Sequence, residues 1–210
     1  MRDAYLSAAD TAMGLLGRPE VAAAWSRPSA LAEWSVGGLA AHLAGQVITV
    51  ARVLDVPTDH SLRPIPLDDH YARAAWVGAE VHDPVNAGIR EGGEKEAAAG
   101  PEGVLGRVRA ARVAVADRLP LEAIDRVVLI PWQGWALTLD DFLTTRMMEI
   151  VVHSDDLAAS VGLEAPAFER AVLDPVLGLL TRLAIRRHGQ SAVVAALARQ
   201  ERAPASIAAF

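Results

Sequence analysis

A glutamate and a histidine stand four residues apart in the stretch RMMEIVVHSDD, at Glu149 and His153. On an α-helix, residues at i and i+4 project from one face one turn apart, so a carboxylate oxygen and an imidazole nitrogen can reach a common point. This geometry can chelate a divalent metal ion. His42 is the best candidate for a third ligand, because it shares a face of its own expected helix with apolar residues. Two imidazoles and one carboxylate suit zinc, iron, nickel or cobalt, and leave a position open for water or substrate.

Four ionisable residues share one face of the helix that carries this pair. At about 100° per residue they fall within an arc of about 80°: Arg146, Glu149, His153 and Asp156. Apolar residues lie on or beside the same arc, so the polar stripe faces the core, where unpartnered ionisable groups would cost several kcal/mol. We therefore expect Arg146 and Asp156 to serve the site, by orienting a ligand or by meeting an anionic substrate.

The same residues also fit a protein without a metal. Arg146 and Glu149 could form an i, i+3 ion pair, and Asp156 could anchor His153 or a backbone group. Trp132 and Trp135, just before the helix, could form an apolar wall of a cofactor pocket or be ordinary core aromatics. The other histidines are expected to be structural or solvated: His60, His70, His82 and His188.

Helices must position these residues. Apolar spacing, with Ser35 as a cap and Gly162 as a stop, predicts helices over 3–16, 36–54, 68–81, 104–119, 140–161, 167–188 and 190–199. The glycine-rich, charged segment 83–103 predicts a mobile crossover, and RVVLIPWQGWALTL predicts a short hairpin or extended connection. The expected fold is an all-α bundle, with a metal-binding domain over 1–165 and a C-terminal helical extension over 166–210 packed on it.

Composition narrows the possible partners. The chain is 52% hydrophobic and 22% charged, as folded globular proteins are. A net charge of -6 without a basic run argues against nucleic acid. Neither a secretory signal nor a membrane span is apparent, so we expect a cytoplasmic protein, possibly a homodimer. The sequence has no cysteine, so any thiol chemistry would use a thiol brought in from outside.

The stretch GWALTLDDFLTTRMMEIVVHSDDLAASVGLEAP resembles the signature of the mycothiol-dependent maleylpyruvate isomerase-like proteins, a branch of the DinB-like four-helix-bundle superfamily. That family repeats Arg, Glu, His and Asp at the spacing of residues 146, 149, 153 and 156. The stretch EWSVGGLAAHLAGQ is similar to the segment that leads to the family's first metal-binding histidine, here His42. The resemblance implies a DinB-like bundle in which His42, Glu149 and His153 hold a divalent metal, usually zinc, that activates the thiol of mycothiol.

The function that the resemblance implies is attack of a metal-bound thiolate on a small electrophile, as a transferase or an isomerase. Family isomerases carry a small α/β domain after the bundle, whereas about fifty residues follow Asp156 here and are predicted to be helical. The resemblance therefore implies metal-dependent thiol chemistry rather than maleylpyruvate isomerisation itself. Two alternatives stay open: a hydrolase that uses metal-activated water, and a non-catalytic bundle that binds a ligand or regulates a partner.

Overall fold

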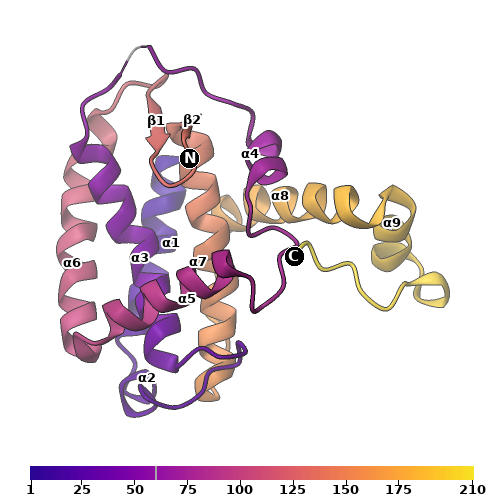
Figure 1. Cartoon of the computed structure of the whole chain (residues 1–210), viewed down its shortest axis with the longest axis horizontal. Helices are drawn as coiled ribbons and strands as arrows, with labels where there is room; N and C mark the ends of the chain where they lie inside the picture. The colour runs from indigo at the N-terminus through magenta and orange to yellow at the C-terminus, as the bar shows by residue number, and fades with distance from the viewer. Residues whose placement is uncertain (60) are drawn as a thin grey trace.

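A computed structural model describes residues 1–59 and 61–210, so His60 lies outside the described residues. This part of the chain forms nine α-helices and one two-stranded hairpin (Figure 1). The α-helices are α1 (Arg2–Leu16), α2 (Pro19–Ala23), α3 (Val36–Asp55), α4 (Leu67–Arg73), α5 (Pro84–Ala97), α6 (Gly100–Arg118), α7 (Leu139–Val161), α8 (Arg170–His188) and α9 (Gln190–Ala198). Short 3-10 turns cover Leu119–Leu121 and Gln200–Arg202. The all-α prediction is confirmed.

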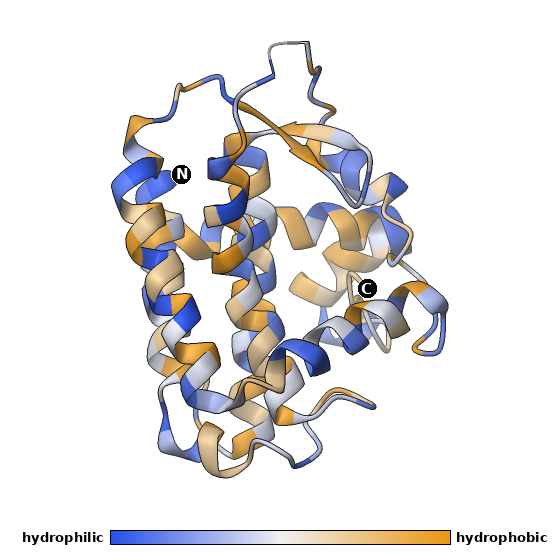
Figure 2. Cartoon of the chain, turned by 60° about the vertical axis from the view of Figure 1, so that its left-hand side comes forward, coloured by the Kyte–Doolittle hydropathy of each residue, from blue (hydrophilic) through white to orange (hydrophobic). Residues whose placement is uncertain are grey.

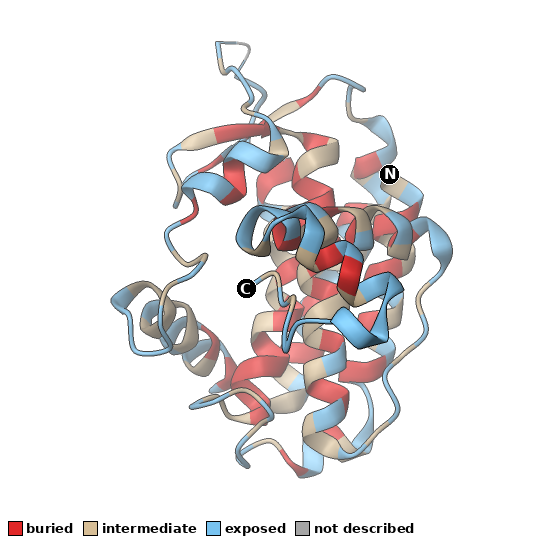
Figure 3. Ribbon diagram, turned by 90° about the vertical axis from the view of Figure 1, so that its right-hand side faces the viewer, coloured by how far each residue is buried: buried red, intermediate tan, exposed pale blue. Residues whose placement is uncertain are grey.

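Four helices, α1, α3, α6 and α7, run side by side as a bundle, and α5 crosses α3 (Figure 1). Apolar and polar residues alternate along these helices, as expected of helices with one buried face (Figure 2). Buried residues gather on the bundle helices, while the surrounding loops are mainly exposed (Figure 3). Large side chains from α3 and α7 fill the centre, among them Leu39, Leu43, Phe142 and Met147.

Local signals set the start and end of the two helices that carry the candidate ligands. The Ser35 hydroxyl accepts a hydrogen bond from the Gly38 amide at 2.9 Å, which caps α3. The Thr138 hydroxyl caps α7 in the same way, from the Asp141 amide at 3.1 Å. Gly162, with φ of 72°, ends α7 in the left-handed conformation that glycine adopts without strain. The predicted ends of both helices are therefore close to the observed ones.

The predicted hairpin is also present. Strands β1 (Val127–Ile130) and β2 (Trp135–Thr138) pair antiparallel, with Val127 opposite Thr138 and Ile130 opposite Trp135. Because β2 runs directly into α7, the hairpin fixes the direction in which α7 enters the bundle.

The predicted mobile crossover over 83–103 is wrong, because α5 and the start of α6 occupy it. Gly93, which suggested flexibility, instead permits close packing: a Cβ there would lie 2.6 Å from the Trp34 ring and 2.9 Å from the Gly38 carbonyl oxygen. The Trp25 indole also donates to the Ala97 carbonyl at 3.2 Å. Contacts with α3 and the segment before it therefore outweigh the weak helix propensity of this stretch.

The predicted helix over 68–81 ends earlier, at Arg73. Ala74 has ψ of 115°, which breaks the helix, and the chain then turns through Gly78 at φ of 78°. Contacts on both sides hold α4: the Ile65 amide donates to the Ala136 carbonyl of β2 at 2.9 Å, and Arg182 of α8 donates to Asp68 at 3.0 Å.

The C-terminal helices extend from the bundle, with α8 packed on α7 and α9 at its far end (Figure 1). The chain then returns, so that the Phe210 ring lies 4.8 Å from the Trp76 ring. Division of the chain into two domains at residue 165 stays a prediction.

By length and apolar composition alone, α3 could cross a membrane. Most of that stretch is buried among α5, α6 and α7, however, which is typical of the central helix of a bundle.

Candidate metal centre

The structure brings His42 of α3 together with Glu149 and His153 of α7. One ligand atom from each lies within 4.8 Å of the others, a group that could hold a metal ion. Glu149 Oε2 is 3.5 Å from His42 Nε2 and 3.1 Å from His153 Nε2. Two ligands of a tetrahedral zinc ion, each bound at about 2.0–2.2 Å, stand about 3.3–3.6 Å apart. The observed separations therefore suit a shared cation, and the 14–21% exposure of these side chains leaves the group open to small molecules.

Asp156 contacts His153 at the edge of the ring that faces away from Glu149. Asp156 Oδ2 lies 3.0 Å from His153 Nδ1, one helical turn further along α7. A proton on Nδ1 that is donated to this carboxylate leaves Nε2 as the metal-binding atom once a cation displaces the proton that Nε2 shares with Glu149. Carboxylates commonly hold metal-binding histidines in this orientation, so Asp156 is placed to serve the group as a positioning residue.

The protonation states of the three residues differ because their partners differ. Burial alone would raise the pKa of Glu149, but hydrogen bonds from His153 and His42 hold it well below its usual value. Burial lowers the pKa of His42, which is therefore neutral at pH 7. Burial would also lower the pKa of His153, but hydrogen bonds to Asp156 and Glu149 raise it to about 9. A cation that binds here must displace the proton from His153.

Arg146 lies one turn before Glu149 on α7, and its partners are neutral. Its Nη1 donates to Gln46 Oε1 at 2.7 Å, and its Nε donates to the Thr145 hydroxyl at 3.0 Å. Within residues 1–59 and 61–210 it forms no ion pair, so the alternative pairing with Glu149 is not formed. Gln46 Nε2 is in turn 3.3 Å from His42 Nε2. Arg146 thus brings an uncompensated positive charge to the group, where it can attract an anion.

The two predicted cofactor-binding tryptophans lie apart. Trp132, 58% exposed, is in the hairpin turn and lines a hollow of about 360 Å³ beside the end of α3 and β1, away from the three ligands. Trp135 contacts His70 of α4, whose Nδ1 accepts a hydrogen bond from the indole at 3.0 Å. The cofactor-binding role of these two residues stays a prediction.

Sequence reasoning missed the aromatic residue beside His42, and it did not predict the burial of two residues of α4. The ring of Trp34 lies edge-on to His42, with 5.4 Å between centroids. His70 and Tyr71 of α4 are buried, and burial of His70 agrees with the structural one of the two roles expected for it. A signal existed for Trp34, which precedes the Ser35 cap, whereas only the tertiary placement of α4 reveals the other two.

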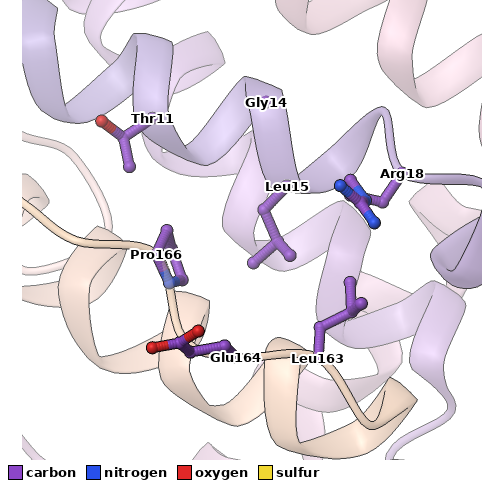
Figure 4. A pocket seen from close by; sticks show the side chains of 7 residues that line it. All are labelled: Thr11, Gly14, Leu15, Arg18, Leu163, Glu164 and Pro166. Atoms are coloured by element: carbon purple, nitrogen blue, oxygen red, sulfur yellow. The ribbon is translucent and has the colours of Figure 1, made fainter.

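A second hollow, of about 420 Å³, lies between α1 and the segment after α7 (Figure 4). Its charged lining residues are Arg18 and Glu164, and Arg18 is paired with Glu20 at 3.0 Å. It contains none of the predicted site residues. The group of His42, Glu149 and His153 is therefore the candidate functional site.

A comparison with protein families finds one match that spans this group. The model of the mycothiol maleylpyruvate isomerase N-terminal domain family matches residues 6–158, which include all three candidate ligands, Arg146 and Asp156. No curated protein and no solved structure gives a significant match.

Proposed function

Because the chain belongs to the mycothiol maleylpyruvate isomerase N-terminal domain family, we propose that it holds one divalent metal ion, most simply zinc, through His42, Glu149 and His153. One observation carries this proposal: three ligand atoms from α3 and α7 lie close together at separations that suit one cation. All three residues fall inside the region that the family model matches. The neutral imidazole of His42, the imidazole of His153 after loss of a proton, and one carboxylate suit zinc. Iron, nickel or cobalt could replace it.

We further propose that the protein catalyses attack of a low-molecular-weight thiol, such as mycothiol, on a small electrophile. A divalent cation at these ligands favours the thiolate form of such a thiol. The chain has no cysteine, so the sulfur must arrive with a cosubstrate. In an isomerase, the thiolate adds to an activated double bond, the adduct rotates about the new single bond, and the same thiolate leaves. In a transferase, the thiolate displaces a leaving group and stays on the product.

The residues around the ligands have distinct roles in this proposal. Arg146 binds a carboxylate of the thiol or electrophile, because its charge has no ionic partner among the described residues. Asp156 orients His153, and Trp34 shields the edge of His42 from water. The substrates are small molecules, and a cytoplasmic location would keep the thiol reduced.

The experiment that tests this proposal starts with metal content. Protein purified without chelator is compared by plasma mass spectrometry with His42→Ala and with a Glu149→Ala, His153→Ala double variant. The expected result is about one metal ion per wild-type chain and none in the variants. Cobalt-loaded protein should then develop a sulfur-to-cobalt absorption band when a thiol is added. No metal uptake would contradict the whole proposal, and turnover that proceeds without any thiol would favour the hydrolase instead.

A further inference from the structure

One buried side-chain amide joins Arg146 to the candidate ligand His42. Gln46 lies one turn after His42 on α3 and is 4% exposed. Its backbone carbonyl accepts a hydrogen bond from the Tyr5 hydroxyl of α1 at 3.1 Å, and its side chain contacts Arg146 of α7, so three helices meet at this residue. The thiol chemistry proposed above assigns no role to the amide of Gln46.

The contacts of Gln46 determine which way its amide faces. The guanidinium of Arg146 can only donate, so the Gln46 atom that lies 2.7 Å from Arg146 Nη1 must be the oxygen, Oε1. The nitrogen, Nε2, then faces His42, where it donates to the backbone carbonyl at 2.9 Å. Because both contacts require the same orientation, the two N–H groups of the amide lie on the His42 side.

One of these two N–H groups lacks a secure acceptor. The first has the His42 carbonyl, and the second meets only the ring nitrogen Nε2 of His42, at 3.3 Å. That nitrogen can accept only through its lone pair, which is used when His42 binds a cation. Within the described part of the chain, Gln46 Nε2 has no other hydrogen-bond partner. A buried N–H without an acceptor is costly, so a metal-loaded site needs an acceptor that the described residues do not provide.

We propose that the second N–H of Gln46 donates to the anionic atom that binds at the open position of the metal centre. That atom is a thiolate sulfur or an anionic oxygen, because each keeps lone pairs after it binds a metal. A donor that is already held in place stabilises such an anion without reorganisation. Arg146 attracts the molecule by its charge, whereas Gln46 contacts the metal-bound atom itself. This inference rests on the proposed function only in that a metal ion occupies the site.

The test uses cobalt-loaded full-length protein, whose visible absorption measures the affinity of small ligands for the metal. Azide is an anion that keeps lone pairs on its bound atom, whereas imidazole is a neutral ligand that keeps none. Loss of one hydrogen bond to a charged group corresponds to about a tenfold weaker affinity or more. We expect that weakening for azide in Gln46→Met, while imidazole binds to this variant as it does to the wild type.

Two control variants keep the amide of Gln46. Tyr5→Phe removes the hydrogen bond to its backbone carbonyl, and Thr145→Val removes the second partner of Arg146. Both should bind azide with wild-type affinity. Equal weakening in either control would mean that disturbed packing or a displaced Arg146 explains the effect, and equal loss of azide and imidazole in Gln46→Met would mean that the site is distorted. Either result, or wild-type azide affinity in Gln46→Met, would overturn the inference.

The outcomes also separate this inference from the thiol chemistry. If azide responds as expected but thiols give no cobalt–sulfur band, the role of Gln46 stands and the thiol function fails. If thiols give the band while Gln46→Met binds azide as the wild type does, only the role of Gln46 fails. Failure of the wild-type protein to take up cobalt would overturn both.

Discussion

Asp156 Oδ2 and His153 Nδ1 lie 3.0 Å apart, on the edge of the imidazole that faces away from Glu149. The carboxylate and the ring come from consecutive turns of α7, so a single helix provides two candidate ligands and the group that orients one of them. Because this contact fixes both the tautomer and the rotation of His153, it should control how tightly a cation is held.

Replacement of Asp156 by asparagine should therefore weaken metal binding about 10- to 100-fold, as loss of an orienting partner typically does. Competition with a chromophoric chelator measures the affinity. The matched control is Asp155→Asn, because Asp155 is the neighbouring acid and is exposed. Equal affinities for the two variants would contradict the orienting role of Asp156.

Metal uptake at pH 7 should release about one proton per chain. In the metal-free protein His153 is protonated below its pKa of about 9, while Glu149 is already ionised and His42 is already neutral. Only His153 must lose a proton to become a ligand. Titration calorimetry in two buffers with different ionisation enthalpies measures the number released. That number should fall as the pH rises through 9, and a heat that is independent of the buffer at pH 7 would refute the assignment.

Arg146 should give the site a preference for carboxylate-bearing thiols. We expect cobalt-loaded protein to bind mercaptoacetate more tightly than 2-mercaptoethanol, because a charged hydrogen bond contributes about 1.5–3 kcal/mol. Arg146→Met should remove most of that preference, and Arg109→Met, a change at an exposed arginine of α6, should retain it. If Arg146→Met keeps the preference, the carboxylate binds elsewhere.

Much of the fold could be predicted from the sequence because its signals are local. The caps Ser35 and Thr138 and the stop Gly162 depend on neighbouring backbone groups, so α3 and α7 have nearly the predicted ends. The chelating pair depends only on the i, i+4 spacing of one helix. The closeness of His42 to that pair required two helices to pack, and the family resemblance indicated it in advance.

The errors arose where distant contacts decide the structure. Gly93 belongs to the glycine-rich segment that predicted a mobile crossover, yet it is a position where α5 packs closely on α3 and Trp34. The burial of His70 was not predicted, because neither its contact with Trp135 nor the position of α4 between β2 and α8 is encoded locally.

Gly93 and Gly92 give a direct test of that packing. A Cβ at position 93 would lie 2.6 Å from Trp34 and 2.9 Å from a carbonyl oxygen of α3, whereas a Cβ at position 92 would have no neighbour within 4 Å. Gly93→Ala should destabilise the protein by about 1–3 kcal/mol through overpacking. It should also weaken metal binding, because Trp34 rests against His42. Gly92→Ala should instead stabilise the protein by about 0.5–1 kcal/mol, since alanine favours a helix. Urea denaturation of the metal-free proteins measures both changes, and equal effects would mean that α5 does not pack closely on α3.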